Sequence, residues 1–442
     1  MQIGIIGTGH VGLITAVTFA ELGHQVIATD NDDAKVQSLL NRKAPFYEPG
    51  LQELLESGLD SGRLQITNDP AGVGRGAEVI FICVGTPPKA SGEASLIAVE
   101  ASARSVAPHF QNRVVVVEKS TVPAGTSRHL ARVLKHARPD MGDDIQVASN
   151  PEFLREGHAI RDSLEPDRIL VGTDTEWATE VMRRVYKPLT DRGHELIETD
   201  IVTAELSKHA CNAFLALKIS YANAMARLCE RAGADISAVA DIMGKDQRIG
   251  RAFLNAGLGY GGFCFPKDLA AFERLSDSLG YEFPLLREIA RINEEALETT
   301  VKRIVEALWN LEGKRIAVLG LAFKPDTDDT RLSPALSLVQ RLLDQEAKVV
   351  GYDPAAGHNA KAEIPELEIA SDPYDAARGA HCLVLATEWE EFTKLDFDKV
   401  KELMEFPVVV DGRNALDPEA VVAAGLSYYP AGRPPVLQPF ER

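Results

Sequence analysis

The sequence predicts an α/β fold with two doubly wound parallel-sheet domains joined by a long central helix. Over residues 1–200, short apolar runs alternate with helical patterns, which is typical of parallel strands and their crossover helices. The stretch from Thr203 to Ala232 then contains neither Pro nor Gly and is rich in helix formers. From Lys314 onward, apolar runs and helical patterns alternate again. We therefore expect domains at 1–200, 201–300 and 301–442.

In the first domain, a helical pattern over Leu13–Leu22 separates the first two of five apolar runs. These runs are the clearest strand candidates: Ile3–Ile6, Gln25–Thr29, Val79–Val84, Val114–Glu118 and Ile145–Ser149.

The central stretch is expected to form one helix of about eight turns, which Gly233 ends. A helix of this length would link two domains and offer an apolar face to a second subunit.

The last domain repeats the layout of the first, and its Pro-rich tail from Gly432 is expected to be loose. Its second strand ends in an acid, but Gly320-Leu-Ala-Phe-Lys-Pro325 lacks dinucleotide glycine spacing. The expected elements are strands at Arg315–Gly320, Lys348–Asp353, His381–Ala386 and Pro407–Asp411, and a helix at Pro334–Gln345.

Composition excludes several classes of protein. The net charge of −18, without a Lys/Arg block, argues against a nucleic-acid binder. No apolar run approaches the roughly 20 residues that span a bilayer, and the chain opens directly on a strand, which leaves no room for a signal peptide. Five widely spaced cysteines suggest neither a metal site nor disulfides, and fit reduced thiols in the cytoplasm.

The chain opens with a dinucleotide-binding pattern. Gly7-Thr-Gly-His-Val-Gly12 follows a strand and opens a helix, and Asp30 ends the next strand. The glycines allow a tight turn and close approach of a pyrophosphate to the helix N-terminus. Asp30 would accept the ribose hydroxyls and repel a 2′-phosphate, which favours NAD over NADP; a solvated strand-end residue is the alternative. Both sheet domains are thus expected to be Rossmann-like, the first one binding NAD.

Two further loops, Cys83–Pro87 and Lys119–Gly125, leave strand ends in this domain, where open α/β sheets bind ligands. The hydroxyls of Thr86, Ser120 and Thr121 are candidates for bonds to cofactor or water, although each taken alone is more typical of a turn or helix cap. Cys83 itself is expected to be core.

A glycine-rich run, Leu258-Gly-Tyr-Gly-Gly-Phe-Cys-Phe-Pro-Lys-Asp268, places Cys264 in a bend with Lys267 and Asp268 close behind it. Ionisable neighbours tune a thiol, and a thiol nucleophile beside a nicotinamide site favours an oxidation through a covalent thioester. An inert buried thiol is the alternative.

Two segments offer groups for the substrate. Lys208 and Asn212 share a face of the long helix, although surface solvation is the default for such residues. The run Asn150–Glu156 follows a strand end, and its Glu152 is the better candidate for a general base toward water, which thioester hydrolysis requires.

With these residues laid out, the whole chain resembles the UDP-glucose 6-dehydrogenase family, within the wider UDP-glucose/GDP-mannose dehydrogenase group. The motifs that carry the resemblance are GTGHVG, CVGTP, KSTVPAGT, SNPEFLREG, ELSKxxxN, DQRIG, the Cys-Phe-Pro-Lys-Asp loop, FKPDTDDTR and DGRN. The resemblance implies four-electron oxidation of UDP-glucose to UDP-glucuronate with two NAD and one water, without release of the aldehyde.

The resemblance also implies residue roles. Cys264 would form a thiohemiacetal and then a thioester, and Lys208 would stabilise the oxyanion at C6. Glu152 would assist proton transfer and hydrolysis. Asp268, Asn212 and Thr121 would order the water.

By the same match, other residues would hold the ligands, and Arg248 would reach the neighbouring subunit's site, which implies a homodimer or higher homo-oligomer. For NAD the residues are Gly7, Thr8, Gly9, His10, Val11, Gly12, Asp30, Lys35, Gly85, Thr86, Ser120, Thr121, Glu156, Lys267 and Arg331. For the nucleotide sugar they are Glu152, Phe153, Leu154, Arg155, Lys208, Asn212, Arg248, Phe253, Asn255, Gly259, Tyr260, Gly261, Lys324 and Arg413.

The chain departs from the family pattern at Phe263, where most relatives carry Ser, and at Tyr260, where Phe is usual. Three alternatives follow: the same chemistry on GDP-mannose or a UDP-N-acetylhexosamine, a two-electron hydroxyacid dehydrogenase that needs no thiol, and an NAD-binding sensor without catalysis.

Overall fold

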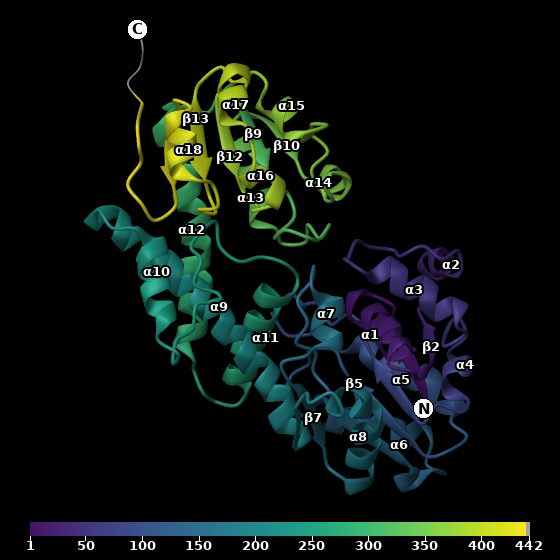
Figure 1. Cartoon of the computed structure of the whole chain (residues 1–442). Coiled ribbons are helices and arrows are strands. Elements are labelled where there is room, and N and C mark those ends of the chain that lie inside the picture. Colours follow the sequence, from purple (N-terminus) through teal and green to yellow (C-terminus); the bar gives the residue numbers. More distant parts are fainter. Residues whose placement is uncertain (439–442) are drawn as a thin grey trace. The chain divides into compact units, whose positions relative to one another are not determined.

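The computed structural model describes residues 1–438 and divides into two compact units (Figure 1). The first comprises Met1–Cys211 and Ala270–Tyr281, and the second Asn212–Leu269 and the chain from Glu282 onward. Each unit has its own parallel-type sheet, which confirms the predicted pair of α/β folds. The three domain boundaries that we expect from the sequence stay a prediction.

The sheet of the first unit has the strand order β3-β2-β1-β4-β5-β6-β7-β8. Its first six strands follow the doubly wound order of dinucleotide-binding domains. The β6–β7 pair is antiparallel, which the sequence did not predict. The strands are β1 (Gln2–Ile6), β2 (Gln25–Thr29), β3 (Leu64–Thr67), β4 (Val79–Ile82), β5 (Val114–Glu118), β6 (Ile145–Ser149), β7 (Ile169–Thr173) and β8 (Leu196–Thr199).

Alternate residues of the central strands enter two cores, one on each face of this sheet. Val79 and Phe81 of β4 pack into one core, whereas Ile80 and Ile82 pack into the other. Helices cover both faces, as a doubly wound sheet requires. They are α1 (His10–Glu21), α2 (Asp33–Leu40), α3 (Leu51–Asp60), α4 (Pro70–Gly74), α5 (Ile97–Val106), α6 (Thr126–Ala137), α7 (Ala159–Leu164) and α8 (Glu176–Thr190).

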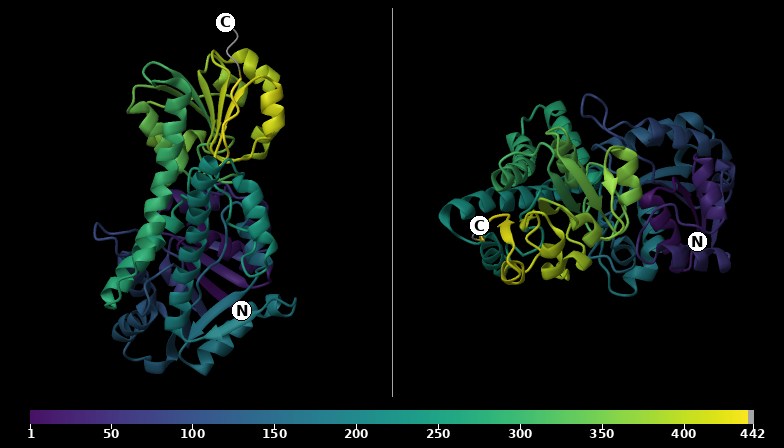
Figure 2. Two further views of the ribbon diagram at one scale, coloured as in Figure 1. Left: turned by 90° about the vertical axis from the view of Figure 1, so that its left-hand side faces the viewer. Right: turned by 90° about the horizontal axis from the view of Figure 1, so that it is seen from above.

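The long helix is confirmed as α9 (Ile201–Ala232), and it is followed by α10 (Ile236–Lys245), α11 (Cys264–Ser278) and α12 (Pro284–Leu308). In the second unit α9 and α12 run side by side (Figure 2). Ser220 Oγ donates to the Ile289 carbonyl at 2.8 Å, and ion pairs join Arg227 to Glu295 and Arg303 to Glu230.

The sheet of the second unit repeats the doubly wound order as β11-β10-β9-β12-β13-β14, with each neighbouring pair parallel. Its strands are β9 (Arg315–Leu319), β10 (Lys348–Tyr352), β11 (Glu368–Ile369), β12 (Cys382–Leu385), β13 (Val408–Asp411) and β14 (Ser427–Pro430). Its helices are α13 (Pro334–Leu343), α14 (Gly357–Glu363), α15 (Pro373–Ala377), α16 (Glu390–Thr393), α17 (Phe397–Leu403) and α18 (Pro418–Ala423).

The prediction of a loose tail is wrong for residues 432–438. Gly432 N donates to Glu230 at 2.7 Å, and Val436 pairs with Tyr428 of β14 through two backbone hydrogen bonds. These bonds hold the segment against α9 and the sheet edge. Residues 439–442 of the tail lie outside the described residues. Within residues 1–438, no helix combines the length and apolar character needed to cross a bilayer.

Candidate active site

The turn between β1 and α1 is shaped by its three glycines. Gly7 has a φ of +91°, and a Cβ there would lie 2.7 Å from the Cys83 carbonyl oxygen. A Cβ on Gly12 would lie 1.8 Å from the Gly7 oxygen, so only glycine fits. At Gly9, in contrast, a Cβ would meet no atom within 4 Å, which leaves the backbone open to a ligand at the N-terminus of α1.

Asp30, at the end of β2, is held by the same turn. Its carboxylate accepts hydrogen bonds from Thr8 N at 2.6 Å and Thr8 Oγ1 at 2.9 Å, and lies 3.2 Å from Lys35 Nζ. Burial alone would raise the pKa of Asp30, but the bonds from Thr8 and Asp32 and the charge of Lys35 outweigh it and lower the pKa. Asp30 is therefore an ionised acceptor fixed beside the glycine turn.

The loop after β4 and the loop after β5 are joined by hydrogen bonds from hydroxyls that are predicted to bind cofactor or water. Thr86 Oγ1 donates to the Thr121 carbonyl at 2.9 Å, and Ser120 Oγ donates to the Ile82 carbonyl at 3.4 Å. These two bonds link the loop after β4 to the loop after β5. Ser120 N also donates to Glu118 at 2.9 Å. Glu118 is buried, and this burial raises its pKa to about 8.

Glu152 and Lys208 form a buried ion pair within the first unit. Lys208 Nζ lies 2.9 Å from Glu152 Oε1, and the two side chains are 5% and 8% exposed. The other carboxylate oxygen of Glu152 accepts from Leu154 N at 2.9 Å, and the Phe153 ring lies 5.2 Å from the ammonium. Burial overturns the expectation of surface solvation for Lys208. The pair brings a carboxylate and a cation together away from bulk water.

Two more residues of α9, both buried, clamp the loop that carries Thr121. Glu205 accepts from Ser127 N and Oγ, each at 2.7 Å, and from Gly125 N at 2.5 Å. One turn later, His209 Nε2 lies 2.9 Å from the Val122 carbonyl oxygen. Sequence analysis assigned no role to His209, because nothing in its spacing indicates which loop it meets.

The loop 150–158 is fixed at its start by Asn150. The Asn150 side chain accepts from Lys119 Nζ at 2.9 Å and from the Tyr186 hydroxyl, and donates to the Leu170 carbonyl at 2.8 Å. Lys119 is buried, and burial lowers its pKa. Further along, Arg155 forms an ion pair with Asp162, 2.7 Å away.

In the second unit Cys264 is exposed and is the first residue of α11. The expectation that it lies inside the glycine-rich bend is corrected: the bend ends before it, and Cys264 begins a helix. A helix N-terminus carries a positive partial charge, so the start of α11 is a position where reactive cysteines occur.

Asp268, one turn after Cys264 on α11, is 1% exposed. It accepts from Asn212 Nδ2 at 2.6 Å and from Lys267 Nζ at 2.7 Å. Asn212 is also buried, against the expectation of solvation. The Asn212–Asp268 bond therefore joins α9 to α11 within the second unit, one turn after Cys264.

The glycine-rich run before Cys264 is held by Asn293 of α12, which sequence analysis missed. Asn293 accepts from Tyr260 N at 2.7 Å and donates to the Tyr260 carbonyl at 3.0 Å. A Cβ on Gly259 would lie 2.6 Å from Asn293 Oδ1, and one on Gly261 would lie 2.4 Å from the Leu332 carbonyl oxygen. These two positions need glycine for close packing.

The remaining predicted substrate residues of the second unit, and Arg331, which is predicted to contact NAD, have the following contacts. Arg413 donates to the carbonyls of Ala386 at 2.7 Å and Gly259 at 3.2 Å. Arg331 pairs with Asp329, and its guanidinium carbon lies 4.7 Å from the Phe263 ring centroid. The others are Phe253, packed edge-on to Phe265; Asn255, which accepts from Arg251; Lys324, over the Phe323 ring; and Arg248, paired with Asp246 and 88% exposed.

Three family models match consecutive parts of the chain. They are the NAD binding domain of the UDP-glucose/GDP-mannose dehydrogenase family over residues 1–190, its central domain over 202–295, and its UDP binding domain over 317–418. UDP-glucose 6-dehydrogenase of Rhizobium meliloti (strain 1021) is 44% identical over 438 residues, which cover 98% of this chain and 100% of the relative. This chain belongs to the UDP-glucose/GDP-mannose dehydrogenase family.

Other members of the family agree in sequence and structure. UDP-glucose 6-dehydrogenase TuaD of Bacillus subtilis (strain 168) is 41% identical, with 98% of this chain and 94% of the relative covered. The structure of a UDP-glucose dehydrogenase from Pyrobaculum islandicum has a TM-score of 0.90 at 38% identity, with 98% of both chains covered. UDP-D-ManNAc dehydrogenase from Pyrococcus horikoshii has a TM-score of 0.87 at 28% identity, with 98% and 99% covered.

The family assignment makes the chain an NAD-dependent dehydrogenase with a nucleotide-sugar substrate. The glycine turn fits NAD, because the backbone at Gly9 is open and Asp30 is an ionised acceptor beside it. The second sheet of this family member has no such turn, since Gly320 is followed by Leu-Ala-Phe-Lys-Pro.

Proposed function

We propose that the chain oxidises the C6 alcohol of UDP-glucose to the carboxylate of UDP-glucuronate, using two NAD and one water, through a covalent intermediate on Cys264. An exposed cysteine at the start of α11, in a chain that is 44% identical to a UDP-glucose 6-dehydrogenase, carries this proposal. NAD, when bound, supplies a hydride acceptor for each of the two oxidations.

The protein's own residues divide the remaining work. The first oxidation gives the C6 aldehyde, and the Cys264 thiolate adds to it to form a thiohemiacetal. The second oxidation gives the thioester, which water cleaves to the carboxylate while the thiol leaves. The Lys208 ammonium stabilises the negative charge that develops on the C6 oxygen. Glu152, whose Oε1 lies 2.9 Å from Lys208 Nζ, takes the proton of the attacking water.

Asp268, Asn212 and Thr121 position the water. Support for this role comes from the buried 2.6 Å bond between Asn212 and Asp268, which fixes both side chains. The residues predicted from the family motifs to contact NAD and the sugar keep those roles in the proposal. Phe263 and Tyr260, where the chain departs from the family pattern, are then the positions to examine first for sugar choice.

The proposal includes a homodimer in the cytoplasm. Phe214, Tyr221 and Leu228 lie seven residues apart on α9 and are 61%, 47% and 56% exposed. Seven residues are nearly two helical turns, so the three form one apolar stripe, which we propose as the subunit contact. Arg248 would reach the partner's site. A reducing compartment would suit the five cysteines, which the sequence predicts to be reduced thiols.

A different nucleotide sugar is the second candidate, because UDP-D-ManNAc dehydrogenase of Pyrococcus horikoshii shares the fold over nearly the whole chain. The test is NADH formation with UDP-glucose, GDP-mannose and UDP-N-acetylhexosamines side by side. UDP-glucose should give the highest kcat/KM. Turnover of another nucleotide sugar, without turnover of UDP-glucose, would make that sugar the substrate.

A variant of the cysteine separates the proposed reaction from the other enzyme class. Cys264→Ser should abolish acid formation, whereas a two-electron hydroxyacid dehydrogenase would keep its turnover. NAD binding without turnover of any sugar would favour the sensor.

A further inference from the structure

A buried carboxylate, that of Glu48, joins two segments of the first unit that the proposed function uses separately. Glu48 precedes α3 and its side chain is 0% exposed. Its Oε2 accepts from Gly157 N at 2.7 Å and its Oε1 accepts from Ala159 N at 2.7 Å. Its Oε2 also lies 3.1 Å from His10 Nε2. None of the sequence motifs of the predicted site includes Glu48.

His10 is the residue of the dinucleotide turn that contacts Glu48. It is the first residue of α1 and lies between Gly9 and Gly12 of the glycine pattern. Its ring stacks on Phe46, with centroids 4.6 Å apart and planes 26° apart, so its orientation is set by packing. The contact between the two side chains is an ion-pair distance, 3.1 Å from His10 Nε2 to Glu48 Oε2.

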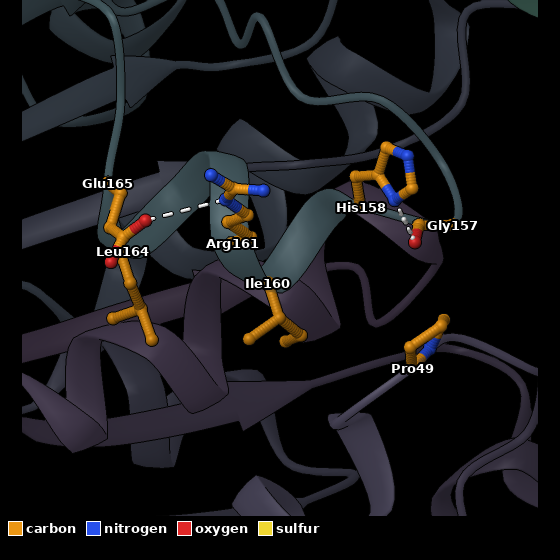
Figure 3. A pocket seen from close by; sticks show the side chains of 7 residues that line it. All are labelled: Pro49, Gly157, His158, Ile160, Arg161, Leu164 and Glu165. Atoms are coloured by element: carbon orange, nitrogen blue, oxygen red, sulfur yellow. Dashed lines mark hydrogen bonds and ion pairs between the residues drawn. The ribbon is translucent and has the colours of Figure 1, made fainter.

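Gly157 and Ala159, whose amides donate to Glu48, lie at the end of the loop that carries Glu152. Gly157 ends that loop, and Ala159 begins α7. Figure 3 shows the outer side of this junction, where Pro49, the residue after Glu48, faces Gly157, His158 and Ile160 across a shallow groove of about 360 Å³. The segment with Glu48 and the end of the loop are therefore joined by buried hydrogen bonds and also line one groove at the surface.

A fully buried carboxylate needs several donors, because its desolvation is costly unless hydrogen bonds replace the lost water. The two amides that donate to Glu48 come from the loop end, and the His10 imidazole of the dinucleotide turn lies 3.1 Å from the same carboxylate, so a displacement of either segment alters the contact with the other. We propose that Glu48 is a positioning residue that couples the dinucleotide turn to the loop bearing Glu152. NAD bound at the turn would then order the loop before substrate oxidation.

Hydrogen exchange read by mass spectrometry tests the coupling without substrate. In the wild type, NAD should slow exchange of the amides in peptides that cover residues 155–160. In Glu48→Gln, exchange there should rise about fivefold without NAD, the equivalent of one lost hydrogen bond, and NAD should no longer slow it. Unchanged exchange in Glu48→Gln, or no effect of NAD on the wild type, would overturn the proposal.

Two substitutions at His10 keep the test decisive if Glu48→Gln fails to fold. His10→Phe keeps an aromatic ring against Phe46 but removes the ring nitrogen that lies 3.1 Å from Glu48, so NAD at a concentration that saturates the variant should no longer slow exchange at 155–160. His10→Gln places a polar nitrogen at the same number of bonds from the backbone and, also saturated with NAD, should retain the effect. NAD-dependent slowing that is equal in both variants would refute the coupling.

Kinetics adds a readout that rests on the proposed function. Glu48→Gln should lower kcat about tenfold through misplacement of Glu152, and saturating NAD should not restore it. Glu53→Gln, at an exposed position on α3, is the matched control and should match the wild type in exchange and kcat. If the wild type turns over no nucleotide sugar, the proposed function fails, but the exchange experiment still decides the role of Glu48.

Discussion

Lys208 Nζ lies 2.9 Å from Glu152 Oε1, and both side chains are more than nine-tenths buried. The lysine comes from the long helix α9 and the glutamate from the loop after β6. Two opposite charges that are withdrawn from water attract each other strongly but also cost desolvation, so each depends on the other. The pair is the link between the stability of the first unit and the chemistry that we propose for it.

Removal of one partner should destabilise the protein more than removal of both. Glu152→Gln leaves the Lys208 ammonium buried without its counter-ion, which should cost about 3 kcal/mol of unfolding free energy. The double variant Glu152→Gln with Lys208→Met should recover part of that loss, because no buried charge remains. Urea unfolding of the wild type, the two single variants and the double variant gives the coupling energy. Additive losses would contradict a coupled pair.

Alkylation by iodoacetamide near neutral pH should distinguish Cys264 from the buried cysteines. Cys264 is exposed at a helix N-terminus, whereas Cys83 is buried and burial raises its pKa to about 12. Burial also raises the pKa of Cys382. Peptide mass spectrometry at short times should therefore find label at Cys264 well before Cys83 or Cys382, and UDP-glucose should slow that labelling. Early label at Cys83 would contradict the assignment of a core thiol.

Stability should depend on pH through Glu118. Burial raises its pKa from an ordinary value of 4.5 to about 8, so the folded protein holds a proton there that the unfolded chain releases. This contribution is complete below about pH 4.5 and is lost as the pH rises through 8, a change on the order of a few kcal/mol. In Glu118→Gln the loss should be absent. Unfolding free energies at pH 5, 6, 7 and 8 for both proteins, with Glu53→Gln as control, measure the difference. Parallel curves would show that Glu118 is ionised when folded.

The apolar stripe on α9 should control assembly. Phe214→Glu places a charge at the proposed contact, where burial of an unpaired charge is strongly unfavourable. Sedimentation velocity should then show a monomer at concentrations where the wild type is a dimer. Ile97→Glu, at a 77% exposed residue of α5, is the matched control and should leave assembly unchanged. A dimer that survives Phe214→Glu would place the subunit contact elsewhere.

The bounds of three predicted strands, β2, β5 and β6, agree with the structure to the residue. Of these, β5 (Val-Val-Val-Val-Glu) is buried at every residue and has the nearly continuous apolar run of a parallel strand covered on both faces. In contrast, β3 (Leu-Gln-Ile-Thr) and β8 (Leu-Ile-Glu-Thr) lie at the sheet's edges, and their mixed composition gave no strand signal. Helix α1 begins at His10, three residues before its predicted start at Leu13, because its N-cap is Gly9, which offers no side-chain cap as a signal.

The candidate site was predictable where chemistry follows local spacing and was missed where it depends on distant contacts. Glycine spacing identified the dinucleotide turn, and the i, i+4 relation placed Lys208 and Asn212 on one face of α9. Glu48 and Asn293 were missed, since their partners, Gly157 and Tyr260, lie far away in sequence. Sequence spacing also gave no measure of burial, so it could not separate the buried Lys208 from a solvated lysine.

The most direct measurement is the NADH yield from limiting UDP-glucose with excess NAD. The proposed thioester route predicts two NADH for each UDP-glucose consumed, together with an acidic product and no free aldehyde. One NADH per UDP-glucose, with the aldehyde released, would contradict the four-electron reaction and remove the need for Cys264 as a nucleophile.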